Sequence, residues 1–335
     1  MTRFVIVGGG GAGMQGAETL RSLRKDDPIT LVSEEDRPFY VRPLLADFVA
    51  GRLPGADLRV GFEERAAAQN ITLMPGRRAV RLDYRRERDL VLDSGQNLPY
   101  DMMLVATGVK PVLPRVPGTN LEGVTTFSTY ADAVTVKRWA QQAKQAVVIG
   151  RGLPALELTR ALRLRGLGVT LLVPDDSPWF LPLFDTTEEE IEKILSQHEV
   201  NVAVLDAPVE FVGSSGKVTM VRTREGRELP ADIVGIASGQ KASTEFLAGS
   251  DIGANEGILV DERLMSSDER IYAAGDVAQI QQATQRRALG YGWMRASSQA
   301  EAAARNMCGG NVTVSVGDEY QAESLYGVSL AARWQ

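Results

Sequence analysis

The chain has 335 residues but only one cysteine, Cys308, and one histidine, His198. A single cysteine excludes a disulfide within one chain and a cysteine cage for a metal ion. His198 lies in "LSQHEVNV", between an amphipathic stretch and a strand-like one, where a surface or packing role is expected. Histidine-based triads, zinc sites and dithiol relays are therefore not expected, and we predict no metal site.

Long apolar runs are also missing, since none approaches the roughly 20 residues of a membrane-spanning helix. The apolar N-terminus leads directly into glycines, which indicates a strand and not a signal peptide. We therefore expect a cytoplasmic protein without a membrane span.

An excess of positive charge is absent as well. The formal net charge of −6 gives no reason to expect nucleic acid as a partner. Arginines are frequent in "GRRAVRLDYRRER", but they alternate there with apolar residues. This alternation favours a solvated strand and turn, with a docking patch as the alternative.

One plan occurs twice along the chain. "FVIVGGGGAGMQGAE" (4–18) and "AVVIGRGLPALE" (146–157) each run from an apolar strand into a glycine-rich turn and a helix. Each is followed by a second strand, by a predicted β-meander beginning at "ITLMPGRRAV" or "VNVAVLDAPV", and by a strand ending in "VATG" or "IASG". The strand "RIYAAGDVA" returns late, which indicates that the second unit is inserted in the first.

The length suits two domains or one very large one, and the repeat favours two. We predict an α/β fold with two Rossmann-like, three-layer ββα nucleotide-binding domains, each with a β-meander. The first domain is predicted to comprise residues 1–110 and 241–310, and the inserted one residues 111–240. Two such domains imply two bound nucleotides.

The first turn fits the pattern G-x-G-x-x-G through Gly8, Gly10 and Gly13, between a strand and a helix. The first glycine allows the tight turn, the second lets a pyrophosphate approach the backbone, and the third lets the helix pack on the strand. The helix N-terminus offers N–H groups to phosphate. The next strand, "ITLVSEE", ends in Glu34 and Glu35, which are suited to bind an adenosine ribose.

The second turn keeps Gly150 and Gly152, and Ala155 is an accepted substitute at the packing position. Pro154 lies in the first helical turn, where its missing N–H costs little. The strand "VTLLV", however, ends at Val173 and a proline, where an acid would normally hold the ribose. The two carboxylates that follow in "PDDSP" would repel a 2′-phosphate, so we expect NADH to be preferred over NADPH.

Four motifs in order resemble those of the FAD-dependent pyridine nucleotide oxidoreductases: "VIVGGGGAG", "LVATGVKP", the second βαβ unit and "ERIYAAGDVA". The resemblance covers residues 3 to about 310 and is nearest to rubredoxin, ferredoxin and nitrite reductase-type enzymes and NADH oxidases. It implies that the outer segments bind FAD and that residues 111–240 bind NAD(H). Residues 311–335 would be a truncated remnant of the family's C-terminal interface domain.

The resemblance also implies roles for single residues. Arg42 and Pro43, in "PFYVRPLL", would lie beside the isoalloxazine, and Glu157 near the nicotinamide, which makes Arg42 and Glu157 the catalytic candidates. The helix near Ala296 would direct its positive end at the pyrimidine edge of the flavin. The FAD site would comprise Gly8, Gly10, Ala12, Gly13, Glu34, Arg42, Pro43, Ala79, Ala106, Thr107, Gly108, Gly275, Asp276, Trp293 and Ala296. The NAD(H) site would comprise Gly150, Gly152, Ala155, Glu157, Val173 and Gly239.

Three features depart from the family. The redox disulfide is absent, most of the interface domain is missing, and Asp47 stands where ferredoxin reductase-type members have a lysine that pairs with the glutamate at position 157. The implied activity is hydride transfer from NADH to flavin N5, with electrons passed to an iron–sulfur protein, a quinone or oxygen. The alternative is an electron-transferring or non-catalytic FAD subunit of a larger complex, with a degenerate nicotinamide site. Either implies a redox partner protein or subunit, and the oligomeric state stays open.

Overall fold

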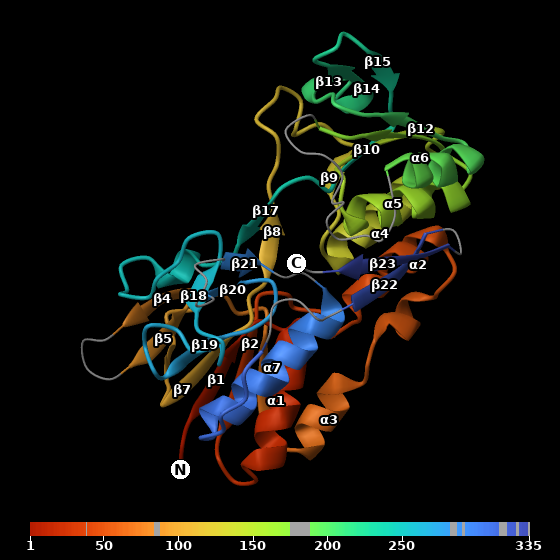
Figure 1. Ribbon diagram of the computed structural model, residues 1–335. Helices are drawn as coiled ribbons and strands as arrows, with labels where there is room; N and C mark the ends of the chain where they lie inside the picture. Colours follow the sequence, from red (N-terminus) through yellow and green to blue (C-terminus); the bar gives the residue numbers. More distant parts are fainter. Residues whose placement is uncertain are drawn as a thin grey trace. The chain divides into compact units, whose positions relative to one another are not determined.

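The computed structural model describes the chain except for Pro38 and residues 84–87, 175–187, 282–286, 290–291, 315–319, 326–327 and 334–335. The chain separates into two compact units (Figure 1). Unit 1 comprises residues 1–41, 59–110 and 241–319, and unit 2 comprises residues 42–58, 111–240 and 320–335. Residues 111–240 of unit 2 thus stand, in sequence, between two segments of unit 1.

Unit 1 is built on a five-stranded parallel sheet with the strand order β19-β7-β1-β2-β3. The late strand β19 pairs in parallel with β7. The sheet strands are β1 (Phe4–Val7), β2 (Ile29–Ser33), β3 (Ile71–Pro75), β7 (Met102–Val105) and β19 (Ile271–Ala273).

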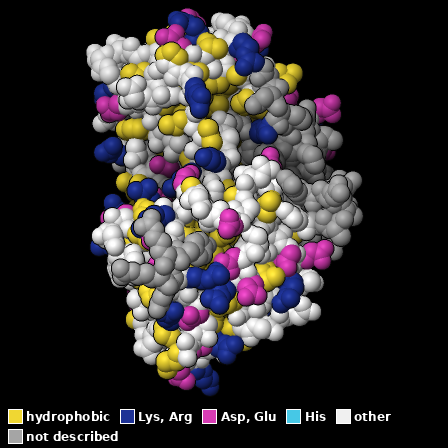
Figure 2. Space-filling view, turned by 90° about the vertical axis from the view of Figure 1, so that its left-hand side faces the viewer, with side chains coloured by type: hydrophobic (Ala, Val, Ile, Leu, Met, Phe, Trp, Pro, Cys, Tyr) yellow, Lys and Arg dark blue, Asp and Glu magenta, His cyan; other side chains and the backbone are white. Residues whose placement is uncertain are grey.

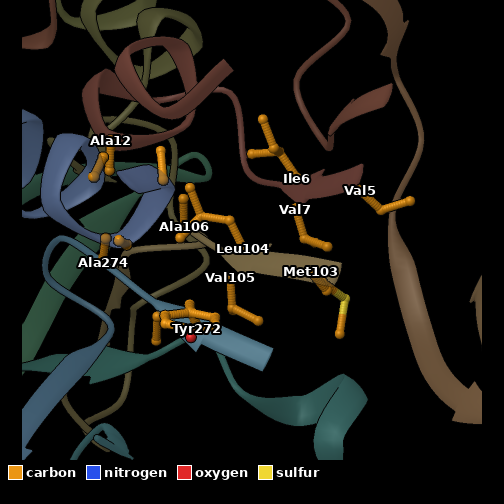
Figure 3. Close-up of a cluster of buried hydrophobic side chains, with 14 of the residues drawn as sticks. Val5, Ile6, Val7, Ala12, Met103, Leu104, Val105, Ala106, Tyr272 and Ala274 are labelled. Atoms are coloured by element: carbon orange, nitrogen blue, oxygen red, sulfur yellow. The ribbon is translucent and has the colours of Figure 1, made fainter. Parts of the chain in front are cut away.

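Both faces of this sheet are covered, which is why its inner strands β1 and β7 are apolar throughout. Helix α1 (Gly11–Leu23) and helix α7 (Trp293–Met307) pack against each other and against the sheet (Figure 1). Helix α7 begins at Trp293, three residues before the start expected at Ala296. Figure 3 shows how side chains of β1, β7 and β19, far apart in sequence, meet in one buried cluster.

An antiparallel meander completes the three layers of unit 1. Leu90 and Leu92 of its middle strand belong to the same core cluster as the parallel sheet. The meander strands are β4 (Ala79–Asp83), β5 (Asp89–Leu92) and β6 (Asn97–Pro99). The other elements of unit 1 are α3 (Phe62–Ala68), η4 (Glu245–Leu247), β18 (Ile258–Val260), β20 (Ala278–Gln281) and β21 (Arg287–Leu289).

Unit 2 repeats this architecture with the parallel strand order β12-β11-β10-β16-β9. Here β9 holds the outer position that β19 holds in unit 1. Residues of the sheet and of the meander β13-β14-β15 share one core cluster, which includes Phe211, Val147 and Ile149. The sheet strands are β9 (Val124–Thr126), β10 (Gln145–Ile149), β11 (Gly168–Leu172), β12 (Val200–Ala203) and β16 (Ile233–Ile236). The meander strands are β13 (Pro208–Ser214), β14 (Lys217–Thr223) and β15 (Glu228–Pro230).

Two helices of unit 2 show how its sequence fixes local structure. Helix α4 (Tyr130–Trp139) begins with a capping box, in which Thr129 accepts from the Asp132 N–H and the Asp132 carboxylate accepts from the Thr129 N–H. Helix α5 (Leu153–Leu164) has Pro154 in its first turn, as predicted, and buries a row of apolar residues against the sheet. The remaining elements of unit 2 are η1 (Arg42–Leu44), α2 (Leu45–Ala50), η2 (Gly55–Leu58), α6 (Glu188–Gln197), β22 (Tyr320–Leu325) and β23 (Val328–Arg333).

The sequence places the strands of "ITLMP" and "VNVA" in the meanders, and this prediction is wrong. These strands, β3 and β12, are the outer parallel strands of the two sheets. Each follows a helix, α3 or α6, and a helical crossover returns the chain to a parallel strand. The meanders begin only at β4 and β13.

Residues 42–58 lie in unit 2, whereas the sequence places them in the first domain. Their anchor is aromatic: the ring of Phe48 in α2 stacks on Tyr130 of α4, with the centroids 5.6 Å apart. The ammonium of Lys137 lies 3.8 Å from the centroid of the same Phe48 ring, and burial lowers the Lys137 pKa. These contacts join residues that are remote in sequence, so no local sequence pattern predicts them.

Chain crossings between the units occur in β8 (Val109–Pro111) and β17 (Gln240–Ala242), which pair as a two-stranded sheet. The glycine before each of these strands has a positive φ, +63° at Gly108 and +69° at Gly239. The repeat therefore extends to the backbone conformation of "ATG" and "ASG".

On the face shown in Figure 2, positive and negative side chains are interspersed.

One buried carboxylate holds the meander of unit 2 to the end of β12. The side chain of Asp206 is fully buried and accepts hydrogen bonds from the N–H groups of Ala207 (2.9 Å) and Glu225 (3.2 Å) and from the Arg227 guanidinium (2.8 Å). Burial alone would raise the Asp206 pKa, but the hydrogen bonds it accepts, including one with the Thr223 side chain, outweigh burial and lower it.

Replacing Asp206 with asparagine is expected to destabilise the meander by about 1–3 kcal/mol at neutral pH, because an amide accepts fewer bonds than a carboxylate. Because the Asp206 pKa is lower in the folded state, the ionised carboxylate stabilises the folded protein at pH values above the unfolded pKa of about 3.9. This stabilisation is lost as the pH falls below that value. The difference between wild type and Asp206→Asn should therefore shrink below about pH 4. Hydrogen exchange of residues 206–230, measured in both proteins above and below about pH 4, tests this prediction. A stability difference that does not change with pH would contradict the role given to the Asp206 carboxylate.

Candidate functional site

The predicted phosphate turn of unit 1 lies at the carboxyl ends of its parallel strands. Gly8 follows β1, and its N–H donates to the carbonyl of Val32 in β2 at 2.8 Å. A Cβ at Gly8 would lie 2.1 Å from the Ala106 carbonyl oxygen, and one at Gly13 would lie 1.8 Å from the Gly8 oxygen. Both glycines are thus required by the packing of the turn on β7 and on α1.

Gly10 is different, because a Cβ there would meet no atom within 4 Å. Its φ of −79° and ψ of −170° suit any residue, so neither packing nor backbone geometry requires a glycine. Gly10 is the N-cap of α1, where the first N–H groups of the helix are open to an anion. The open space above Gly10 therefore fits a pyrophosphate that lies directly on the backbone.

The ribose end of this site contains an acid and a lysine. Glu34 follows β2, is exposed, and its Oε2 lies 3.0 Å from Nζ of Lys110. Glu35 instead accepts hydrogen bonds from the Tyr40 hydroxyl at 3.0 and 3.1 Å. The role of Glu34 as a ribose ligand stays a prediction. Ala79 is the first residue of β4 and pairs with Leu92 in the meander.

The late segment of the chain reaches the same turn. A Cβ at Gly275 would lie 3.2 Å from the Ala12 Cβ and 3.3 Å from the Ala296 Cβ, and one at Gly11 would lie 3.0 Å from the ring of Trp293. Asp276 is half-buried, and its Oδ1 accepts from the Gly292 N–H at 3.3 Å, next to the start of α7. The structure thus brings these sequence-predicted residues together within unit 1.

Two further contacts of this region were not predicted from the sequence. The side chain of Gln299 is buried in α7, and its Oε1 accepts from the Gly275 N–H at 2.9 Å. The hydroxyl of Thr107 donates to the Ser243 carbonyl at 2.8 Å, which ties the "ATG" turn to the chain after β17. A glutamine inside an amphipathic helix gives no signal of this role, because most such residues face solvent.

Unit 2 builds the corresponding turn with the same geometry. The Gly150 N–H donates to the Leu172 carbonyl at 3.0 Å, and Gly152 is the N-cap of α5 with φ −89° and ψ 178°. A Cβ at Gly150 would lie 2.5 Å from the Ala237 oxygen and 3.1 Å from the Ala155 Cβ. The turn is intact, and its N-terminal N–H groups also fit phosphate.

The ribose end of unit 2 lacks the acid of unit 1. Val173 is buried after β11, and its N–H donates to the Ala203 carbonyl at 2.8 Å. Asp175 and Asp176, the carboxylates that follow, lie outside the described residues. Glu157 is half-buried in the second turn of α5, and Gly239 follows β16.

Asp47 finds a cation other than the lysine that the family would supply. Its Oδ1 accepts from Nη2 of Arg160 at 2.9 Å, and the Arg160 side chain is only 12% exposed. Arg160 lies three residues after Glu157 on α5, so it occupies the same side of the helix. This ion pair joins α2 to α5 within unit 2. The family's pair would have its lysine on α2 and its glutamate on α5, whereas here the acid lies on α2 and the cation on α5.

Arg42 and Pro43 belong to η1 of unit 2. The Arg42 guanidinium donates to the Ser128 carbonyl, a contact that holds the loop before α4. This hydrogen bond is consistent with a structural role for Arg42 in holding the loop. The flavin-side role of Arg42 stays a prediction.

No group of three or more His, Cys, Asp or Glu side chains in the described part of the chain could hold a metal ion. Among the helices described, none is long and apolar enough to cross a membrane. His198 is exposed at the end of α6, as the sequence suggests.

Several curated proteins are similar to this chain. An NAD(P)H nitrite reductase of Bacillus subtilis (strain 168) is 29% identical over 310 residues, which are 92% of this chain and 37% of the relative. A nitric oxide reductase FlRd-NAD(+) reductase of Aeromonas hydrophila is 31% identical over 279 residues, 83% of this chain and 71% of the relative. The chain thus spans little more than a third of the first relative.

Solved structures agree with the fold. The structure of a covalent putidaredoxin reductase–putidaredoxin complex has a TM-score of 0.91 and 25% identity, and the match covers 99% of this chain and 81% of that chain. A NAD-dependent persulfide reductase from A. fulgidus gives a TM-score of 0.90 and 27% identity, covering 99% of this chain and 64% of that one. The predicted α/β fold with two Rossmann-like domains is confirmed.

A family model described as pyridine nucleotide-disulphide oxidoreductase matches residues 2–304. This match spans both phosphate turns, both meanders and the start of α7. It confirms the resemblance stated from the sequence motifs, although the single Cys308 excludes a redox disulfide within the chain. The chain belongs to the pyridine nucleotide-disulphide oxidoreductase family.

Proposed function

We propose that the protein is an FAD-dependent oxidoreductase that takes hydride from NADH and passes the electrons to a separate acceptor. The observation that carries the proposal is the pair of equivalent phosphate turns, at Gly10 in unit 1 and at Gly152 in unit 2. One protein with two such turns can hold two dinucleotides. FAD, when bound, supplies the capacity to accept a hydride and to release its electrons onward.

In unit 1 the chain's own residues bind and orient FAD. The backbone at Gly10 and the N-terminus of α1 hold the pyrophosphate, while Glu34 accepts hydrogen bonds from the adenosine ribose. Asp276 and the start of α7 take the opposite end of the cofactor, where the positive helix end favours an anionic flavin ring. None of these residues needs to act as an acid or base.

In unit 2 the chain binds NADH through the turn at Gly150 and Gly152. Glu157 lies one turn into α5 and faces the nicotinamide end in this proposal. Arg160, fixed by Asp47, then sets the direction of α5 relative to α2. Since NADH is a cytoplasmic cosubstrate, the proposal includes a cytoplasmic location.

The acceptor is proposed to be a small redox protein. This choice is supported by the names of relatives: rhodocoxin reductase of Rhodococcus erythropolis, 31% identical, and a ferredoxin–NAD(+) reductase component of a biphenyl dioxygenase system, 30% identical. An NADH oxidase of Methanocaldococcus jannaschii, 28% identical, keeps oxygen as a second choice. Assays with an iron–sulfur protein, a quinone and oxygen separate these acceptors.

Replacing Gly152 with valine tests the proposed division of labour between the units. The purified Gly152→Val protein should keep FAD and its yellow colour, because the FAD turn is in unit 1. Its flavin should be reduced by dithionite, but reduction by NADH should be slower than in wild type by about a hundredfold or more, since the side chain occupies the pyrophosphate position. Wild-type rates of reduction by NADH in this variant would refute the NADH site in unit 2.

A second candidate function is an electron-transferring or non-catalytic FAD subunit of a larger complex. One observation favours it: β11 ends at the buried Val173, without the ribose acid that unit 1 has in Glu34. On this alternative the flavin stays oxidised in the presence of NADH and is reduced only when a partner subunit is added.

Replacing Arg42 with methionine tests whether this arginine tunes the flavin. A fixed cation near the ring favours the reduced, negatively charged flavin, and guanidinium stays protonated at any working pH. Arg42→Met should therefore lower the two-electron midpoint potential by about 30 mV or more and slow reduction by NADH, with FAD still bound. An unchanged potential with full FAD content would assign Arg42 a structural role, in line with its hydrogen bond to the Ser128 carbonyl.

A further inference from the structure

The two phosphate turns can be aligned residue by residue through their hydrogen bonds. The Gly8 N–H donates to Val32 and the Gly150 N–H to Leu172, so Ser33 and Val173 are equivalent ends of β2 and β11. The next connection repeats too, since Arg77 N donates to Ser33 and Asp206 N donates to Val173. Position 151 of unit 2 therefore corresponds to position 9 of unit 1.

Gly9 shows where a side chain at this position is directed. A Cβ at Gly9 would lie 2.6 Å from Oγ and 2.9 Å from Cβ of Ser33, and 2.7 Å from the Phe39 ring. The position thus faces the end of β2, directly before Glu34. In unit 1 the space is filled and only glycine fits.

In unit 2 the equivalent residue is Arg151, and the equivalent strand end carries Val173 and Pro174 in place of Ser33 and Glu34. Arg151 is half-buried and lies in the turn between Gly150 and Gly152. By the alignment, its Cβ is directed toward the end of β11, where the adenosine ribose would lie. In unit 2 the cation Arg151 is thus directed toward the strand end at which unit 1 has the acid Glu34.

These two charges select different nucleotides. A carboxylate accepts hydrogen bonds from the 2′-hydroxyl of NADH, whereas an arginine fork matches the 2′-phosphate of NADPH. We propose that Arg151 is a specificity-determining residue that binds the 2′-phosphate of NADPH, so that unit 2 admits NADPH beside NADH. The inference rests on the proposed nucleotide site of unit 2, and it reduces the NADH preference expected from "PDDSP".

The test compares ligands that differ only in the 2′-phosphate, using the holoprotein so that FAD fills its own site. Calorimetry measures the Kd of 2′,5′-ADP and of 5′-AMP for wild type, Arg151→Gln and Arg151→Lys. Anaerobic reduction of the flavin by NADPH and by NADH is measured in parallel. Arg138→Gln, which removes an exposed arginine at the end of α4, serves as the control for charge alone.

The expected result is that Arg151→Gln weakens 2′,5′-ADP about ten- to a hundredfold, the range of a charge-assisted pair, and 5′-AMP by less than about threefold. The ratio of kcat/KM for NADPH to that for NADH should fall by a similar factor, Arg151→Lys should fall between, and Arg138→Gln should match wild type. An unchanged ratio, or tighter binding of both ligands once the arginine is removed, would overturn the inference. If wild type responds to neither NADH nor NADPH and binds neither probe, the proposed function itself fails.

Discussion

A Gly10→Val protein should fold and purify without colour. The backbone at Gly10 accepts any residue, and a Cβ there meets nothing within 4 Å, so the protein's own packing is undisturbed. The valine side chain would instead occupy the space in which the pyrophosphate of FAD has to lie. We expect FAD content to fall by about a hundredfold or more, with an unchanged circular dichroism spectrum.

The matched control is Gly152→Val, the equivalent change at the N-cap of α5 in unit 2. It adds the same side chain to the same kind of turn, so a general effect of the substitution would appear in both proteins. Only the Gly10 variant should lose its flavin. A yellow Gly10→Val protein with one FAD per chain would remove the basis for placing FAD in unit 1.

A Gly13→Val protein should fail at folding, not only at binding. A Cβ at Gly13 would lie 1.8 Å from the backbone oxygen of Gly8, which no rotation of a side chain can relieve. We expect unit 1 to lose about 3 kcal/mol or more of its free energy of unfolding, because α1 must move away from the sheet. Urea unfolding and soluble yield measure this loss.

Gly95→Ala is the control for that experiment. Gly95 lies in the meander turn of unit 1 with φ +83° and no atom within 4 Å of a built Cβ. Its replacement should cost only about 1 kcal/mol, through backbone strain, and should leave FAD bound. Equal stability of Gly13→Val and wild type would show that the turn is packed differently.

The contrast between Gly10 and Gly13 shows how much of the site the sequence could predict. Strand, turn and helix follow from local pattern, so the fingerprint located Gly10 and Gly13 and their counterparts, Gly152 and Ala155. The closing strand of unit 1 was also predictable, since "RIYAAGDVA" has the apolar run of a buried parallel strand.

Contacts between remote segments could not be predicted in this way. Residues 42–58 continue the first unit in sequence, yet the stacking of Phe48 on Tyr130 and the Asp47–Arg160 pair fix them in unit 2. The outer strands β3 and β12 were assigned to the meanders, because strand pattern does not reveal which neighbour a strand pairs with. Gln299 carries no local mark of its bond to Gly275.

The central claim is that NADH reduces an FAD held by this chain without help from another subunit. The direct measurement is an anaerobic titration of the purified holoprotein with NADH, followed through the absorbance of oxidised flavin. We predict rapid bleaching that is complete near one equivalent of NADH and is reversed by admitting an acceptor. A spectrum that stays oxidised with excess NADH, although dithionite bleaches it, would contradict the account and favour the subunit alternative.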